Sequence, residues 1–146
     1  LLDRAILFDG HNDLPMAIRE KLGPVPDLSR YDLRSRSPGH TDIPRLREGR
    51  VGAQFWSVYI PGEARGEFAR TQLEQIAIAR RVIDAYPDTF VLAATAADVE
   101  RAHRSGRIAS MLGMEGGYGI ENSLGLLQTY YDLGVRYMAL THNVHL

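Results

Sequence analysis

A histidine and an aspartate two residues apart, His11 and Asp13, follow a short apolar run near the start of this sequence. Side chains two positions apart on an extended strand point to the same face, so these two can converge on one point. An imidazole nitrogen and a carboxylate oxygen aimed at one spot form half of a metal site. Gly10 leaves room for an ion or substrate to approach the backbone. Polar residues that simply close a strand would give the same pattern.

Two further polar side chains follow apolar runs. Glu115 comes after residues 108–114, and His142 comes after residues 135–140. A carboxylate at the end of a buried strand needs a cation or hydrogen-bond donors, because burying an unpaired charge is costly. The amides of Gly116 and Gly117, or an arginine, are the alternative donors for Glu115. His142 is either a hydrogen-bonded structural residue or a site residue that contacts substrate rather than metal.

If the strands form a β/α barrel, their C-terminal ends lie together at one end of the barrel. The active sites of such enzymes are at this end. Glu115 would then face His11 and Asp13, and one carboxylate can bridge two metal ions about 3.5–4 Å apart. Oxygen ligands with an imidazole suit Zn²⁺, with Mn²⁺ and Fe²⁺ as alternatives. His145 is a weaker alternative ligand, and we assign no chemistry to His40 or His103.

Composition narrows the class of protein. The 146 residues are 45% hydrophobic and 24% charged, which predicts one globular domain. The formal charge of −1 comes from 17 basic and 18 acidic residues spread along the chain, so no nucleic-acid or anionic-membrane partner is expected. The densest basic stretch is interleaved with acids and is interpreted as a solvated face. Its members are Arg34, Arg36, Arg45, Arg47 and Arg50.

The sequence contains no cysteine, which excludes disulfides and thiolate metal ligands and favours a cytoplasmic location. Neither a transmembrane run of 18 apolar residues nor a signal-peptide pattern occurs in it. Because the chain begins at Leu1 and not at a methionine, we expect it to be a fragment of a longer protein.

Short apolar runs alternate with helical patterns, as is typical of βα units around a mainly parallel sheet. A Pro- and Arg-rich surface excursion is expected over residues 23–39. Strands are expected at residues 2–8, 51–60, 108–114 and 135–140, and helices at residues 41–49, 67–86, 95–104 and 124–133.

Capping residues set the bounds of several of these helices. Thr41 or Asp42 would cap the first helix, with Pro44 in its first turn and Gly49 as its stop. Thr95 and Asp98 form a capping box for a helix that Gly106 closes. In the helix expected over residues 67–86, apolar residues recur at three- and four-residue steps and should pack on the sheet. They are Ala69, Leu73, Ile76, Ala79 and Ile83.

Five motifs occur in order along the chain and carry a family resemblance. They are Asp9-Gly10-His11-Asn12-Asp13-Leu14-Pro15, Thr41-Asp42-Ile43-Pro44-Arg45-Leu46, Gly52-Ala53-Gln54-Phe55-Trp56-Ser57-Val58-Tyr59, Glu115-Gly116-Gly117 and Leu140-Thr141-His142-Asn143. Together they resemble the N-terminal portion of the renal dipeptidase-like (membrane dipeptidase) zinc metallopeptidases. The resemblance extends over nearly the whole chain.

This resemblance implies an α/β fold, the N-terminal part of a (β/α)8 TIM-like metallohydrolase barrel related to the amidohydrolases. It implies a two-zinc active site that hydrolyses dipeptides, including some with a D-residue on the C-terminal side. His11 and Asp13 would bind one zinc, Glu115 would be the catalytic carboxylate that bridges both, and His142 would contact the substrate near the scissile carbonyl. A bridging water or hydroxide would attack the amide carbonyl while the metals stabilise the oxyanion.

The chain also departs from the family pattern. The family completes the second zinc with two later histidines, and a later Arg and Asp serve the substrate; that region is absent here. A complete barrel takes roughly 250 residues, so residues 1–146 with about four strands are expected to be the N-terminal portion of one barrel domain whose C-terminal half is missing. Tyr118 stands where many members have His, which would alter hydrogen bonding around Glu115. Val144, His145 and Leu146 leave the pattern, so the sequence leaves open whether these three residues are native.

Three functions follow as alternatives. The first is a zinc-dependent dipeptidase with dipeptide substrates, for which the resemblance leaves open a homodimer and a membrane anchor. The second is a catalytically incomplete half barrel, whose open β edges would make it persist only by pairing with another chain. The third is a related amidohydrolase that acts on another amide or a lactam.

Overall fold

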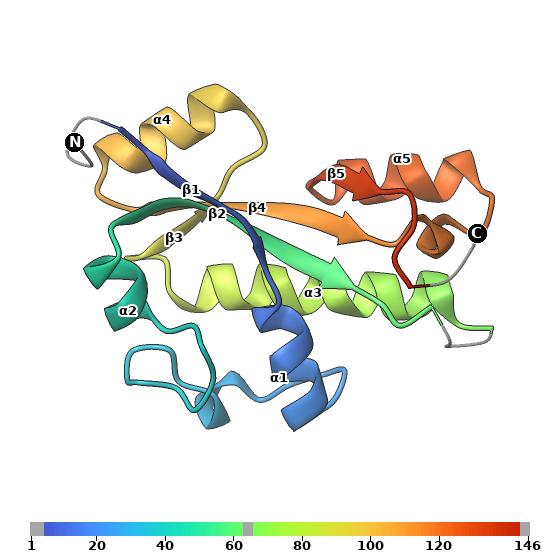
Figure 1. Ribbon diagram of the computed structural model, residues 1–146, viewed down its shortest axis with the longest axis horizontal. Helices are drawn as coiled ribbons and strands as arrows, with labels where there is room; N and C mark the ends of the chain where they lie inside the picture. The colour runs from blue at the N-terminus through green and yellow to red at the C-terminus, as the bar shows by residue number, and fades with distance from the viewer. Residues whose placement is uncertain (1–4, 63–65, 144–146) are drawn as a thin grey trace.

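A computed structural model of the chain describes residues 5–62 and 66–143 and has an α/β fold (Figure 1). Its five-stranded sheet has the order β1-β2-β4-β3, with β5 also paired to β4, and every pairing is parallel. The C-terminal ends of the strands therefore lie along one edge of the sheet. The strands are β1 (Leu7–Asn12), β2 (Val51–Tyr59), β3 (Phe90–Leu92), β4 (Ile108–Glu115) and β5 (Val135–Ala139).

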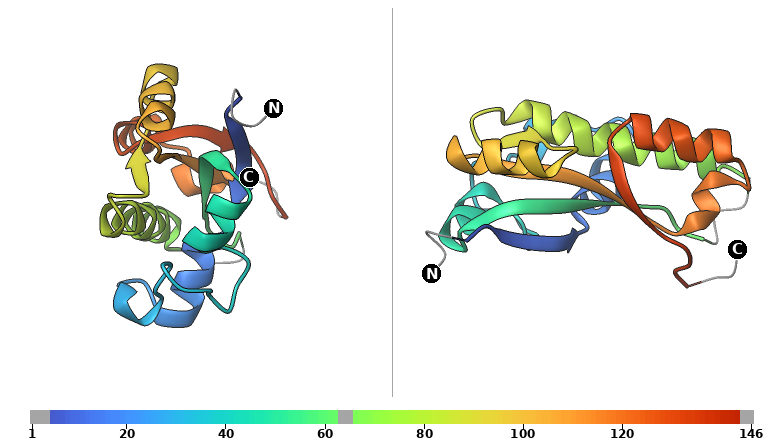
Figure 2. Two further views of the ribbon diagram at one scale, coloured as in Figure 1. Left: turned by 90° about the vertical axis from the view of Figure 1, so that its left-hand side faces the viewer. Right: turned by 90° about the horizontal axis from the view of Figure 1, so that it is seen from above.

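Strand β4 lies at the centre of this sheet. Along one edge it pairs with β2 from Ala109 to Glu115. Along the other edge, β3 pairs with its first residues and β5 with its last ones. Among the described residues β1 pairs only with β2, so β1 is an edge strand, and Figure 2 shows it at the outside of the sheet.

Helices cover the sheet on both faces. They are α1 (Leu14–Leu22), α2 (Ile43–Glu48), α3 (Phe68–Ala85), α4 (Ala96–Arg104) and α5 (Leu124–Asp132), with short 3-10 turns at Leu28–Arg30 and Gly117–Ile120. The longest, α3, runs along one face and packs there with residues that include Trp56 and Leu112. Helix α4 packs with Ala53 and Met111. Because side chains alternate along a strand, α3 and α4 lie on opposite faces.

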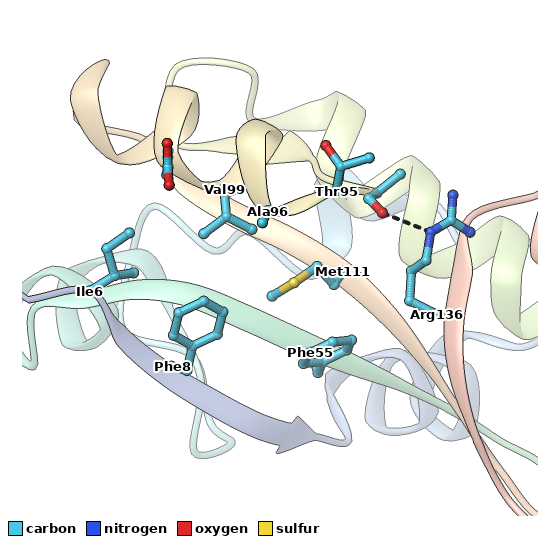
Figure 3. A pocket seen from close by; sticks show the side chains of 10 residues that line it. Ile6, Phe8, Phe55, Thr95, Ala96, Val99, Met111 and Arg136 are labelled. Atoms are coloured by element: carbon cyan, nitrogen blue, oxygen red, sulfur yellow. Dashed lines mark hydrogen bonds between the residues drawn. The ribbon is translucent and has the colours of Figure 1, made fainter.

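The face that α4 covers in part also holds a pocket of about 420 Å³ (Figure 3). Phe8 of β1, Phe55 of β2 and Met111 of β4 line it from the sheet side, and Val99 lines it from α4. Phe8 is 51% exposed, an unusual state for a phenylalanine. The molecule thus has a second apolar surface besides the core under α3.

Most of the expected elements are confirmed, and their bounds move by a few residues. Helix α2 has Asp42 as its N-cap and Gly49 as its C-cap, and α4 has the complete Thr95/Asp98 capping box. Strands β2, β4 and β5 and helices α3 and α5 also occur where the sequence predicts them. Among the described residues, no helix is both long enough and apolar enough to cross a membrane.

The first strand was predicted wrongly. Its expected range begins within residues 1–4, which lie outside the described residues, and its predicted end at Phe8 is four residues too early. The strand continues through His11 to Asn12, because Asp9 and Asn12 pair with Gln54 and Trp56 of β2. Backbone pairing with a neighbour, not apolar content, sets this boundary.

Helix α1 and strand β3 were missed. Pro15 in the first turn and Gly23 at the end mark α1, but the helix is short. Strand β3 has three residues, too few for a periodic pattern to form. The excursion at residues 23–39 is also not wholly on the surface, because Tyr31 and Leu33 are buried.

Two predictions about side chains need correction. Leu73, expected on the buried face of α3, is 39% exposed, whereas Gln72 and Gln75 are buried. The amides of these glutamines donate to the carbonyl oxygens of Val58 and Tyr59 at the end of β2, so polar anchoring replaces apolar packing there. Arg45 does not belong to a solvated face, because its guanidinium pairs with the buried Asp42 carboxylate at 2.6 Å.

Candidate metal centre

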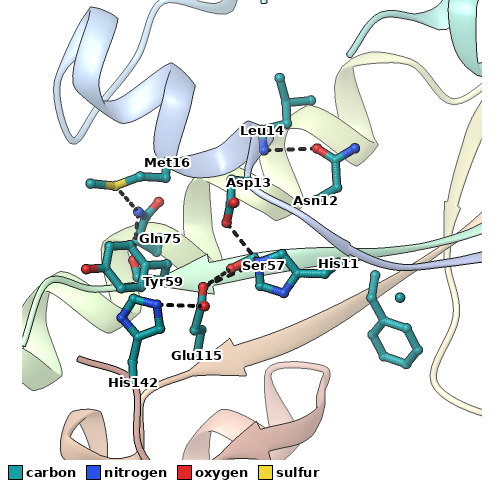
Figure 4. A network of polar contacts seen from close by, with 12 residues as sticks. His11, Asn12, Asp13, Leu14, Met16, Ser57, Tyr59, Gln75, Glu115 and His142 are labelled. Carbon is teal, nitrogen blue, oxygen red and sulfur yellow. Dashed lines mark hydrogen bonds and ion pairs between the residues drawn. The ribbon is translucent and has the colours of Figure 1, made fainter. Parts of the chain in front are cut away.

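Three of the predicted ligands meet at the C-terminal edge of the sheet (Figure 4). Each of His11, Asp13 and Glu115 offers one ligand atom, and these atoms all lie within 4.8 Å of one another. His11 Nε2 is 3.1 Å from Asp13 Oδ1 and 3.4 Å from Glu115 Oε2. The predicted convergence of residues 104 positions apart in the chain is therefore present.

The donor set fits a divalent cation. One imidazole nitrogen and two carboxylates form a mixed nitrogen and oxygen set of the kind that zinc and neighbouring first-row metals accept. The side chains of His11 and Asp13 are 43% and 63% exposed, whereas that of Glu115 is 19% exposed. An ion can therefore enter from solvent and meet a partly buried carboxylate beneath it.

The turn between β1 and α1 places Asp13 beside His11. Asp13 is not part of the strand; it is the N-cap residue of α1. The Asn12 side chain holds this turn, since its Oδ1 accepts from the Leu14 amide at 3.1 Å and its Nδ2 donates to Thr41 Oγ1 at 3.0 Å. At Gly10, a Cβ atom would meet nothing within 4 Å, so the backbone beside the cluster is open, as expected.

Side chains orient the Glu115 carboxylate. Ser57 Oγ, fully buried on β2, donates to Oε2 at 3.1 Å. His142 Nε2 lies 3.2 Å from the other oxygen, Oε1. Of the alternative donors, the Gly117 amide donates instead to the Leu140 carbonyl oxygen at 3.1 Å. Both oxygens of Glu115 thus face polar side chains from other parts of the chain.

His142 lies at the same rim, as predicted. Its ring meets the Tyr59 ring edge to face, with centroids 5.1 Å apart. Together with Asp13, Met16 and Glu115 it lines a pocket of about 320 Å³ beside the cluster. This places His142 where it can touch a molecule that contacts the cluster.

The other histidines and Tyr118 differ in where they lie relative to the cluster. His40, to which we assigned no chemistry, lines a pocket of about 310 Å³ together with His11 and Asp13. His103 lies on α4, away from the cluster. His145, with the whole segment 144–146, lies outside the described residues. Tyr118 donates from its hydroxyl to the Ile60 carbonyl oxygen at 2.8 Å.

Tyr137 of β5 is a residue near the cluster that the sequence did not reveal. Its hydroxyl lies 3.3 Å from the Gly10 carbonyl oxygen and 3.5 Å from His11 Nδ1. Burial raises the pKa of Tyr137, and the carboxylates of Glu115, Asp13 and Asp9 raise it further. A tyrosine within an apolar strand gives no sign of such a contact, because its partners lie 126 and 127 residues earlier.

Comparisons with known proteins show the family to which the chain is similar. The family model described as membrane dipeptidase (peptidase family M19) matches residues 1–146. Dipeptidase ataJ of Aspergillus terreus is 44% identical over 97% of this chain, and dipeptidase verJ of Clonostachys rogersoniana is 42% identical over 98% of it. The chain spans 36% and 39% of the lengths of these two relatives.

Two solved structures share the fold at moderate identity. A metallo peptidase from Rhodobacter sphaeroides, liganded with a phosphinate mimic of the dipeptide L-Ala-D-Ala, has a TM-score of 0.76 and 25% identity. The match covers 93% of this chain and 45% of that one. The metallo peptidase called dipeptidase AC, of family M19, has a TM-score of 0.76 and 27% identity over 93% of this chain and 42% of its own.

Proposed function

The chain belongs to the membrane dipeptidase family, peptidase family M19, and on that premise we propose that it is part of a zinc-dependent dipeptidase that hydrolyses the peptide bond of dipeptides. The observation that carries the proposal is the convergence of His11, Asp13 and Glu115 at the C-terminal edge of a parallel sheet. Active sites of β/α barrels occupy this edge. The names of the two curated relatives support the same activity.

In this proposal His11 and Asp13 would hold one zinc ion, and Glu115 would offer its carboxylate to that ion and to a second. Zinc bound there lowers the pKa of a water and polarises the substrate carbonyl. Glu115 is the catalytic carboxylate, kept in position by Ser57 and His142. Its partial burial favours a pairing with cations, because a carboxylate shielded from water gains more from each neighbouring charge.

His142 contacts the substrate near the scissile carbonyl in this account. Its imidazole lies beside Glu115 and at the wall of the pocket that Met16, Ala17 and Tyr59 also line. The L-Ala-D-Ala mimic bound by the Rhodobacter protein supports dipeptides with a D-residue on the C-terminal side as substrates.

We further propose that residues 1–146 are the N-terminal portion of a single barrel domain. The chain spans less than two fifths of the length of the two curated relatives. Its edge strand β1 and the apolar pocket lined by Phe8 and Phe55 lie where further strands would close a barrel. Those strands would supply the remaining ligands of the second zinc.

Metal content and turnover together test the proposed function. The purified full-length protein that contains this chain should bind zinc and hydrolyse L-Ala-D-Ala. Glu115→Gln should lower zinc occupancy and reduce turnover by about 100-fold or more. Loss of a metal ligand should reduce activity at least as much as loss of a residue that only hydrogen-bonds to a ligand. Glu100→Gln, the same change on exposed helix α4, should alter neither.

Three results would contradict the proposal. They are a protein that binds no zinc, dipeptide hydrolysis that survives Glu115→Gln, and zinc-dependent turnover of a lactam or another amide without any turnover of dipeptides. The last result would identify a related amidohydrolase in place of a dipeptidase.

A further inference from the structure

Tyr137 reaches across the sheet because the strand beside it has a glycine at the opposing position. Tyr137 of β5 pairs with Gly113 of β4 in the parallel register. A Cβ atom at position 113 would overlap the Tyr137 ring, so only glycine leaves space for it. The ring also packs against Phe55 of β2, with centroids 5.0 Å apart. Gly113 of β4 and Phe55 of β2 therefore fix the direction in which the Tyr137 side chain points.

The hydroxyl at the end of that ring meets β1 at the candidate metal ligand. It lies 3.3 Å from the Gly10 carbonyl oxygen and 3.5 Å from His11 Nδ1. The other ring nitrogen of His11, Nε2, faces the Asp13 and Glu115 carboxylates. The two nitrogens of one imidazole thus have separate partners, a phenol on one side and the candidate metal ligands on the other.

Only one arrangement of protons suits metal binding through Nε2. A nitrogen that binds a metal carries no proton, so the proton of the neutral ring must be on Nδ1. Nδ1–H then donates to the Tyr137 oxygen, and the Tyr137 hydroxyl donates to the Gly10 carbonyl oxygen. Every group in this chain has a partner. An acceptor beside the nitrogen that does not bind the metal selects the tautomer and holds the ring of a metal-ligating histidine.

We propose that Tyr137 is a positioning residue for the metal centre: its hydroxyl holds the His11 imidazole with Nε2 directed at the ion. This inference rests on the proposed function, since it assumes that His11 binds a metal. It adds to that function a residue from β5, which closes a contact between the two strands at opposite sides of the β2–β4 pair.

Tyr137→Phe tests the inference, because it removes the hydroxyl and keeps the ring over Gly113. Zinc affinity is measured by competition with a chromophoric chelator, and the absorption spectrum of the Co²⁺-substituted protein reports ligand geometry. We expect zinc affinity about 10- to 100-fold weaker than in the wild type and an altered Co²⁺ spectrum.

Tyr130→Phe is the matched control. Tyr130, a residue of α5, is fully buried, and its hydroxyl donates to the Gly119 carbonyl oxygen at 2.8 Å. The same chemical change there should lower stability without changing zinc affinity or the Co²⁺ spectrum. A loss of zinc affinity in Tyr137→Phe that Tyr130→Phe does not share would therefore come from the metal centre and not from general loosening of the fold.

Three outcomes overturn the inference, and they are distinguishable. If wild-type protein binds zinc and Tyr137→Phe binds it as tightly with the same Co²⁺ spectrum, or if Tyr130→Phe weakens zinc binding equally, Tyr137 is not a positioning residue and the proposed function stands. If the wild-type protein binds no zinc, both the inference and the proposed function fail.

Discussion

Ser57 shows how much of the candidate site depends on single hydrogen bonds. Its hydroxyl is fully buried and donates to Glu115 Oε2, the oxygen that also faces His11. A carboxylate that lost this donor could rotate away from His11 and Asp13. The geometry of a metal centre is usually set by such outer partners as much as by the ligands.

We therefore expect Ser57→Ala to weaken zinc binding by about 10-fold or more while the free energy of unfolding of the metal-free protein falls by only about 1 kcal/mol. The measurement is chelator competition together with urea unfolding. Ser110→Ala is the control, because Ser110 is equally buried on β4 but its hydroxyl contacts the Ile108 carbonyl oxygen. Equal loss of zinc affinity in both variants would show that Ser57 does not orient Glu115.

At the scale of elements, helix α2 depends on its buried cap. Burial disfavours the charged form of Asp42, but hydrogen bonds from the Arg45 side chain and amide and from the Ser37 amide outweigh it, so the pKa of Asp42 is lowered. The folded state thus binds the Asp42 proton less tightly than the unfolded chain does. This stabilisation is complete above about pH 4, the ordinary pKa of an aspartate, and is lost as pH falls through the folded value.

Asp42→Asn should accordingly lower the free energy of unfolding at pH 7 by about 1.5–3 kcal/mol, the worth of hydrogen bonds to a charged group. The loss of stability between pH 4 and pH 2 should also become shallower than in the wild type. Urea unfolding across this pH range measures both effects. Asp27→Asn, the same change at an exposed N-cap, should lower the free energy of unfolding much less. If the stability of Asp42→Asn falls between pH 4 and pH 2 as steeply as that of the wild type, the lowered pKa of Asp42 is refuted.

The pairing of β4 with β5 gives a second element-scale prediction. Gly113→Ala places a Cβ atom against the Tyr137 ring and should cost about 1–3 kcal/mol, as overpacked sites do. Gly10→Ala, on β1, puts its Cβ into open space and should cost less. Urea unfolding compares the two, and equal costs would mean that Tyr137 moves away without penalty.

Local signals made much of the fold predictable. Asp42 with Pro44, and Thr95 with Asp98, define helix starts through contacts within four residues. The end of β1 was not predictable in this way, because pairing with Gln54 and Trp56 keeps its polar residues extended. Periodicity also misplaced Leu73, since it cannot reveal that two glutamines anchor α3 to the end of β2.

The same distinction holds for the candidate site. His11, Asp13, Glu115 and His142 were predictable, because polar residues that follow apolar strands stand out in the sequence and in the family motifs. The residues that orient them were not. Ser57 is 58 positions from Glu115, and Tyr137 is 126 positions from His11, and neither contact leaves a local pattern.

At the scale of the whole molecule, the sheet has a covered face and a partly open one. Helix α3 covers the first, whereas the pocket lined by Phe8, Phe55 and Met111 opens on the second, the face that also carries Tyr137. Strand β1, with Leu7 38% and Phe8 51% exposed, pairs on one side only among the described residues. Exposed apolar edge strands promote association.

Residues 1–146 expressed alone should therefore self-associate in a concentration-dependent way. Phe8→Ser should reduce this association, because it removes apolar area from the edge and from the pocket. Leu124→Ser is the control: Leu124 is 77% exposed on α5, away from the pocket. Sedimentation velocity at several concentrations measures this association. A chain that stays monomeric throughout would contradict the proposal that further strands cover this face and close a barrel.

The most direct test of the metal centre is an anomalous difference map from crystals of the zinc-loaded protein, measured above and below the zinc absorption edge. The account predicts a zinc peak about 2.0–2.2 Å from His11 Nε2 and from carboxylate oxygens of Asp13 and Glu115. A map without a peak between these three side chains, or with zinc bound only at other residues, would contradict it.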